Sequence, residues 1–337
     1  MKTSPFNAGF EKHADTVGRW NGLHGSALAL ALHAAASDRD RPVLVVTASS
    51  HRAQVLHRDL ELLAEGDLPL LLFPDHETLP YDPFSPHPDI IAERLKTLSG
   101  LPKLQQGLLL CPVSSLMQRL PPADYILQRS FDLSAGDRLS IDSFRSRLSH
   151  AGYESVEQVY QSGQFAVRGS VVDLFPSGSP VPYRIDLFDE DIDSIREFDA
   201  DSQRSTGKVD GIHMLPAREY PADLESLEAF RRAFRNRFDV DTRQVSLYQD
   251  LRSGVHPQGL EQYLPLFYEH TSTLLDYLGR APQLVRADGV EEAAEAQQRR
   301  TLERWEQRRH DIERPILEPG ELFLTPQELE VAWAGAP

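Results

Sequence analysis

This sequence contains almost no cysteine: Cys111 is the single one among 337 residues. One thiol can form no disulfide within the chain, which favours a reducing compartment, and the apolar neighbours in 108–113 indicate a buried structural thiol rather than a nucleophile. No run of 18 apolar residues could span a membrane, and residues 1–13 lack the apolar core of a signal peptide. We therefore expect a cytoplasmic protein.

Positive charge is also scarce. The 51 acidic residues outnumber the 35 Lys and Arg, which leaves a net charge of −16. Binding to a nucleic-acid backbone needs clustered cations, because counterion release supplies most of that affinity. The acidic balance therefore opposes general nucleic-acid binding and favours a protein-binding module.

Metal-binding patterns are missing as well. The twelve histidines form no HExxH motif and no cluster with cysteine. His51 and His57 are not spaced to share one helix face, and His76 and His87 fall in a proline-rich stretch. The sequence therefore predicts no metal site.

What the chain does have is a stretch of alternating residues, 164–198. Its apolar and polar positions alternate with the period of a half-buried strand and predict a β-hairpin that turns at Gly178. In this register Arg168 lies opposite Phe188, and Arg184 lies one pair nearer the turn on the same face. Arginine and aromatic residues are enriched where proteins bind each other, so this face is a candidate interface.

A plainer interpretation of the same face stays open. Phe188 could cap a minor core, and the two arginines could be solvated or paired with nearby carboxylates, namely Asp189, Asp191 or Asp193. A register slip of one residue would also move Arg168 to the other face relative to Phe188.

The hairpin carries a family resemblance. The sequence RGSVVDLFP, followed by YRIDLFDEDIDSIREFDADSQR, resembles domain 2 of the region shared by the excision-repair protein UvrB and the bacterial transcription-repair coupling factor (Mfd) family. Residues 79–98 and 112–120 are more similar to the coupling factors. The resemblance is colinear from about residue 20 to 333, and it implies that domain 2 binds UvrA at the positions of Arg168, Arg184 and Phe188.

The resemblance also locates a degenerate nucleotide site. UvrB-like proteins carry a Walker A loop in which glycine N–H groups cradle phosphate, Lys neutralises it and a hydroxyl holds Mg²⁺. The matching octet, 22–29, has Leu28 in place of Lys and Ala29 in place of the hydroxyl. In the Walker B region at most Asp288 remains, with Arg286 beside it. We therefore expect no bound cofactor and no ATPase activity.

The expected fold class is α/β with an inserted α+β domain, as in UvrB-like domains 1a, 2 and 1b, on a degenerate P-loop NTPase-type fold. Residues 1–121 form domain 1a, 122–215 domain 2, and 216–337 domain 1b, which completes the α/β domain. Within 18–49 an Ala/Leu-rich helix is expected before the strand at 42–46. Further helices are expected at 52–65, 141–151, 222–239 and 291–313, a helix or helix pair at 260–278, and further strands at 68–73 and 127–133. In the helix at 222–239, Leu224, Leu227, Phe230, Phe234 and Phe238 predict a core stripe.

Four arginines of that helix permit a different function. They could bind phosphate, which predicts a steep salt dependence of duplex binding, or they could pair with neighbouring carboxylates. They are Arg231, Arg232, Arg235 and Arg237.

The resemblance implies an adaptor: an N-terminal fragment of a coupling factor that binds UvrA and recruits nucleotide excision repair to stalled RNA polymerase. RNA polymerase, DNA, ATP and Mg²⁺ would then be bound only by C-terminal parts of the family, including the helicase motor, and the fragment is expected to be a monomer. The alternatives are a UvrB-like ATP-dependent damage-recognition protein and an acidic interaction module with an unrelated partner. For the adaptor, we expect Arg184→Ala or Phe188→Ala to weaken UvrA binding strongly and hardly move the melting temperature.

Overall fold

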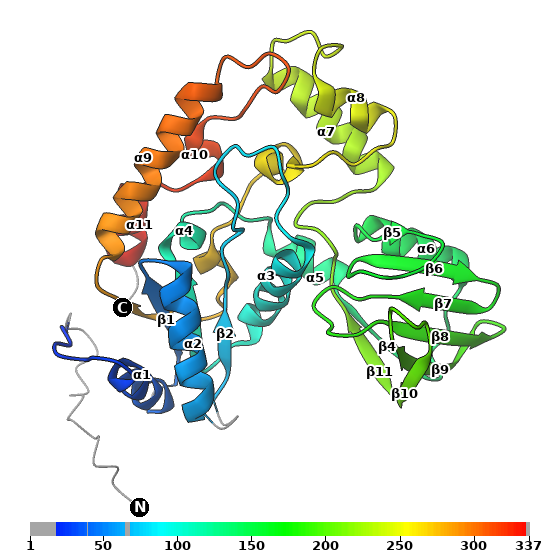
Figure 1. Cartoon of the computed structure of the whole chain (residues 1–337), viewed down its shortest axis with the longest axis horizontal. Coiled ribbons are helices and arrows are strands. Elements are labelled where there is room, and N and C mark those ends of the chain that lie inside the picture. Colours follow the sequence, from blue (N-terminus) through cyan, green and yellow to red (C-terminus); the bar gives the residue numbers. More distant parts are fainter. Residues whose placement is uncertain (1–17, 39, 65–67, 335–337) are drawn as a thin grey trace, which may run out of the picture.

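The computed structural model describes residues 18–38, 40–64 and 68–334 (Figure 1). The stretch 1–13, in which we expect no signal peptide, lies outside the described residues. Within the described ranges, no helix combines the length and apolarity needed to cross a membrane.

Four parallel strands form the first sheet, in the order β12-β1-β3-β2. Every residue of β1 and β3 is buried, as their continuous apolar sequence predicts for strands covered on both faces. The strand β12 follows the second sheet in sequence, so the first sheet combines two separate pieces of the chain, as expected. The strands are β1 (Pro42–Thr47), β2 (Leu70–Leu72), β3 (Gly107–Pro112) and β12 (Gln283–Arg286).

Helices cover both faces of this sheet (Figure 1). On one face α1 and α2 pack on Val43, Val45, Leu108 and Leu110. On the other face α3, α4, α5, α9 and α11 contribute to the core. These helices are α1 (Ala27–Ser37), α2 (Ser50–Ala64), α3 (Pro88–Gly100), α4 (Val113–Leu116), α5 (Ala123–Arg129), α9 (Val290–Arg308) and α11 (Pro326–Ala334).

Cys111 lies within the core of the first sheet, with no exposed surface. Burial raises the pKa of its thiol well above the usual value, because a thiolate would be desolvated there. The prediction of a buried structural thiol is confirmed.

Aromatic residues dominate the core beneath α7, where Phe230 and Phe234 are buried. The predicted core stripe is wrong at Leu224, whose residue is 80% exposed, because it lies at the first position of the helix. The apolar segment 260–278 forms a pair of short helices, as one of the two expectations has it, and both are 3₁₀ helices; Pro265 lacks the N–H that an α-helix would need there. The elements of this part are α7 (Leu224–Arg237), α8 (Ser246–Arg252), η2 (Leu260–Leu266) and α10 (Pro319–Leu322), whereas η1 (Leu101–Lys103) and η3 (Leu274–Tyr277) contribute to the core of the first sheet.

The second sheet lies to one side of the rest of the chain, drawn in green in Figure 1. Its six strands follow the order β10-β9-β8-β7-β6-β5, and its inner face packs against α6. A two-stranded sheet of β4 and β11 adds to the same core. The elements are β4 (Phe131–Ser134), α6 (Ile141–His150), β5 (Glu154–Ser155), β6 (Gln164–Arg168), β7 (Val171–Leu174), β8 (Tyr183–Phe188), β9 (Asp191–Phe198), β10 (Ser205–Val209) and β11 (Gly211–Met214).

The predicted single hairpin is wrong, because 164–198 forms four strands. A tight turn at Gly169, whose φ is 60°, ends β6 and starts β7 inside the stretch that the alternation treats as one strand. As a result Arg168 pairs with Val171, not with Phe188. Phe188 instead pairs with Asp191 across the next turn.

The expected strand at 127–133 is also partly wrong. Residues 123–129 form α5, which begins directly after two prolines, and the strand β4 starts only at Phe131. Proline is favoured at helix starts because the missing N–H is unbonded there in any case. The division of the chain at 121/122 and 215/216 stays a prediction.

Candidate functional site

The outer face of the six-stranded sheet brings Arg168 and Arg184 together through Asp173. Asp173 on β7 lies directly opposite Arg184 on β8, and Arg168 reaches it from β6. The Asp173 side chain is 0% exposed, that of Arg184 22% and that of Arg168 54%. Exposure therefore rises from the carboxylate outward to the two guanidinium groups.

Arg184 is held firmly in this arrangement. Its Nε donates to Asp173 Oδ1 at 2.7 Å, its Nη2 to Oδ2 at 2.9 Å, and its Nη1 to the Gln203 carbonyl at 3.3 Å. The guanidinium also lies 5.0 Å from the centre of the Phe198 ring. The hydrogen bonds and charge of Asp173 raise the pKa of Arg184 further, because both favour the cation.

Arg168 is held at one end only. Its Nη2 donates to Asp173 Oδ2, the oxygen that Arg184 Nη2 also bonds. Within the described part of the chain, its Nε and Nη1 have no hydrogen-bond partner. Both arginines thus lie on one face, as predicted, but their partner is Asp173 and not one of the acidic residues of 189–193.

Phe188 lies on the same face of β8, four residues beyond Arg184, and is 78% exposed. The interpretation that it caps a minor core is wrong. A minor core does exist on this face, but it consists of Val159, Ala166 and Phe198.

Sequence reasoning missed Asp173 and a third arginine, Arg196. Arg196 lies opposite Arg184 on β9, and its Nη2 is 3.4 Å from Asp186 Oδ2. Alternation along β9 could have placed Arg196 on the outer face. Asp173 was missed because the single-hairpin register treats β7 as part of the strand that contains Arg168. The outer face therefore carries three arginines on its strands, each of which pairs with Asp173 or Asp186.

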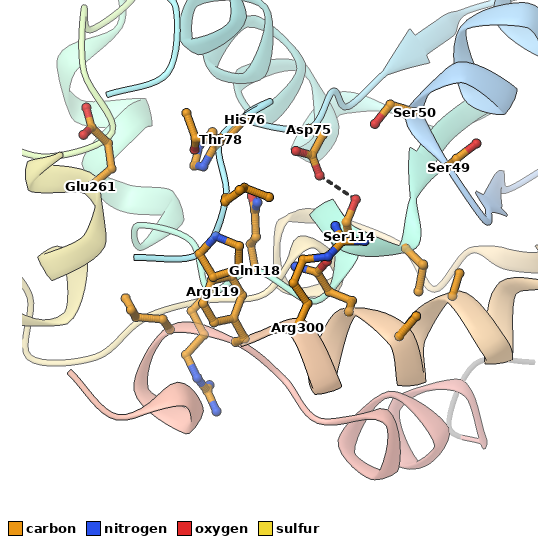
Figure 2. Close-up of a pocket in the computed structure, with 18 of the residues that line it drawn as sticks. Ser49, Ser50, Asp75, His76, Thr78, Ser114, Gln118, Arg119, Glu261 and Arg300 are labelled. Atoms are coloured by element: carbon orange, nitrogen blue, oxygen red, sulfur yellow. Dashed lines mark hydrogen bonds between the residues drawn. The ribbon is translucent and has the colours of Figure 1, made fainter. Parts of the chain in front are cut away.

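A separate cavity of about 320 Å³ lies at the carboxyl ends of β1, β2 and β3, beside α9 (Figure 2). This edge is where α/β sheets usually bind ligands. Ser114 Oγ donates to Asp75 Oδ2 at 2.5 Å, and His76 bonds the buried Glu219 at 2.9 Å. Ser114 and Asp75 thus satisfy each other, whereas the buried Oε1 of Gln118 has no hydrogen-bond partner within the described residues.

Two arginines, Arg119 and Arg300, line the cavity. Arg119 donates to the Gly320 carbonyl and to Glu328, and Figure 2 shows its guanidinium turned away from the other labelled side chains. Among the residues that the structure describes, His, Cys, Asp and Glu form no group of three or more that could hold a metal ion.

The octet 22–29 does not line this cavity, and neither does Asp288. Ala29, where the resemblance expects the Mg²⁺-binding hydroxyl, is fully buried in the core between α1 and the sheet. Leu28, where it expects the lysine, packs against the same core. Arg286 is bonded to Glu291 at 2.7 Å.

The arginines of α7 are mostly engaged with other side chains. Arg237 pairs with Glu321 at 2.7 Å, Arg235 donates to the Tyr248 hydroxyl at 2.8 Å, and Arg231 lies over the Tyr248 ring. The predicted pairing with carboxylates is confirmed for Arg237 alone.

Comparison with known proteins first defines the class of the second sheet. Residues 131–220 match the family model of the UvrB interaction domain. This range contains every strand of the six-stranded sheet together with β4, α6 and β11.

The remaining matches cover most of the chain. It is 42% identical to a transcription-repair-coupling factor of Haemophilus influenzae over 302 residues, which are 89% of this chain and 26% of the relative. The corresponding protein of Escherichia coli is 41% identical over 91% of this chain and 27% of its own length. That of Bacillus subtilis is 31% identical over 76% and 23%. The chain belongs with the N-terminal region of the transcription-repair coupling factors, and it spans about a quarter of the length of these relatives.

Proposed function

We propose that this chain is the adaptor part of a transcription-repair coupling factor. Its UvrB interaction domain binds UvrA and so recruits nucleotide excision repair to stalled RNA polymerase. The observation that carries this proposal is the outer face of the second sheet, where the exposed Phe188 lies on the same face as Arg168 and Arg184. These three residues form the proposed contact surface.

The chemistry of the face suits a protein partner that presents carboxylates around an apolar pocket. Arginines anchored to a buried carboxylate have already lost much of their side-chain freedom, so ordering them on binding costs less. An exposed phenylalanine gains the burial of its ring in the complex, and arginine and aromatic residues are typical of binding hot spots.

The test is a calorimetric titration of the chain with UvrA. We expect Phe188→Ala to weaken binding by about 2 kcal/mol, because the variant removes the apolar anchor. Leu224→Ala is the matched control, since Leu224 is 80% exposed but lies on α7, outside the matched domain. Equal affinities of the wild type and Phe188→Ala would reject this surface, and absence of binding by the folded wild type would reject the function.

We also propose that the chain binds no ATP and works as a monomer. The support is the chemistry of the octet 22–29, in which the partly buried Leu28 and the buried Ala29 supply neither a cation nor a Mg²⁺ ligand. In the whole protein, nucleotide, DNA and RNA polymerase are then bound by other domains. Titration with a fluorescent ATP analogue in the presence of Mg²⁺ should give no saturable signal, and a saturable one would favour the UvrB-like enzyme.

A further inference from the structure

We propose that Asp173 assigns different tasks to the two arginines of the outer face. Arg184 is a positioning residue that holds the face together, and Arg168 is the residue whose guanidinium binds a carboxylate of the partner. This inference rests on the proposed function, because it concerns the same surface.

Arg184 has fewer free N–H groups for a partner than Arg168, because three of its five already donate hydrogen bonds. All three of its guanidinium nitrogens already donate hydrogen bonds, two of them to Asp173 and one to the Gln203 carbonyl. Gln203 is itself fixed, since its side-chain Nε2 donates to the carbonyls of Val159 and Ala200. Arg184 therefore joins three segments of the sheet and its loops at one point.

Arg168, in contrast, has most of its N–H groups free for a partner. One of its nitrogens bonds Asp173, while Nε and Nη1 have no hydrogen-bond partner within the described residues. Its position at the end of β6, beside the turn at Gly169, leaves more than half of the side chain exposed. Free N–H groups of a guanidinium that is already oriented are well suited to a charge-assisted bond with a carboxylate.

Asp173 makes this division stable. A fully buried carboxylate is costly unless its oxygens are bonded, and here Arg184 bonds both of them in a bidentate pair. The one carboxylate faces two guanidinium groups, so the group retains a net positive charge. The excess positive charge lies on Arg168, at the exposed side of the group, where an acidic side chain of the partner can approach.

The first test compares lysine variants in titrations of the full chain with UvrA. Arg168→Lys should weaken binding about tenfold at an unchanged melting temperature, because lysine keeps the charge but loses the fixed N–H groups. Arg184→Lys should lower the melting temperature and weaken binding by less than about threefold. The proposal is overturned if Arg184→Lys loses as much affinity as Arg168→Lys while its melting temperature stays that of the wild type.

The second test follows the arginine Nε–H signals by NMR and needs no partner. In the free chain, hydrogen exchange at Arg184 Nε–H should be slow, and it should become fast in Asp173→Asn. Exchange at Arg168 Nε–H should already be fast, as at the exposed Arg232, and should slow when UvrA is added. Equally fast exchange at Arg184 and Arg232 in the wild type would overturn the positioning role, even if Asp173→Asn fails to fold.

The two tests separate the inference from the proposed function. If the wild type does not bind UvrA, the proposed function fails, whereas the exchange rates in the free chain still decide whether Asp173 and Arg184 form a fixed unit. If UvrA binds but exchange at Arg184 is fast, the function stands and the division of tasks is wrong.

Discussion

Two carboxylates in this chain are each bonded by two basic side chains. The two groups differ in how far their basic side chains are exposed to solvent. Asp173 lies under the outer face of the second sheet, bonded by Arg168 and Arg184. Glu219 lies 3% exposed beside the first sheet, bonded by Arg94 Nε at 2.8 Å and by His76 Nε2 at 2.9 Å. The same pairing chemistry thus occurs once at a surface and once in the interior.

In the interior group Arg94 and Glu219 are shielded from solvent, and only His76 is partly exposed, at 14%. Arg94 is fully buried; its Nη1 donates to the Pro74 carbonyl, and its Nη2 has no hydrogen-bond partner in the described structure. Glu219 lies at the end of the matched UvrB interaction domain, and Arg94 lies on α3, so the pair joins the two parts of the molecule. A buried cation can only hold structure together, whereas a cation that reaches water, as Arg168 does, keeps bonding capacity for a partner.

The largest effect is expected from Glu219→Ala. Removal of the carboxylate leaves Arg94 as a buried charge without its partner, which should lower the free energy of unfolding by about 3–5 kcal/mol. Urea denaturation followed by circular dichroism measures this loss. A loss below about 1 kcal/mol, as is typical of an exposed pair, would show that the interior pair contributes no more than a surface one.

The interior pair also predicts a pH dependence. Burial alone raises the pKa of Glu219, but the charges and hydrogen bonds of Arg94 and His76 outweigh it and lower the pKa from 4.5 to about 2. A carboxyl whose pKa is lower in the folded state contributes stability above its unfolded pKa and loses it as the pH falls through the folded value. This lowering corresponds to about 3 kcal/mol.

Glu219→Gln isolates this contribution. The difference in unfolding free energy between the wild type and the variant should be constant above about pH 5 and should shrink as the pH falls toward 2. Urea titrations at a series of pH values measure it. A difference that does not change with pH would contradict the assignment to Glu219.

A smaller loss of stability is expected from Arg184→Ala. The variant removes the bidentate partner of the buried Asp173 and should lower the free energy of unfolding by about 1–3 kcal/mol. Arg168→Ala should cost less, because Arg184 still bonds both carboxylate oxygens. Thermal unfolding of both variants checks the order. The contacts of Arg184 therefore argue against the expectation that its removal hardly moves the melting temperature.

The smallest effect is expected where neither partner is buried. Asp241 and Arg243 form a pair at 2.7 Å on the surface, with the Arg243 side chain 84% exposed. Water and salt screen such a pair, so Asp241→Ala should leave the unfolding free energy unchanged within error. A clear loss of unfolding free energy in the same urea experiment would show that solvent exposure does not explain the different contributions of the Glu219, Asp173 and Asp241 pairs.

Parts of the fold followed from local patterns. The buried strand β1 and the helices α2, α6 and α9 lie close to their expected positions, because strong periodicity and continuous apolar runs depend on few distant contacts. Alternation also assigned Arg168 and Arg184 to one face correctly. This assignment is correct because side chains alternate between the two faces within each strand, although the predicted number of strands was wrong.

The errors came from backbone conformations that neighbouring residues do not specify. A turn at Gly169 splits the expected strand in two and so introduces β7 with Asp173 between the two arginines. Helical periodicity around Leu224 does not specify which other elements cover the first turn of α7. In the fold, Leu224 in that turn faces solvent.

By itself, the sequence determined the family and the apolar strands of the first sheet. These depend on residue identity and local order alone. Only the tertiary structure decided that Asp173 pairs with both arginines, that Glu219 pairs with Arg94, and which cations still reach solvent. Such pairings join residues from different strands and helices, and burial then sets whether each charge holds the fold or remains free for a partner.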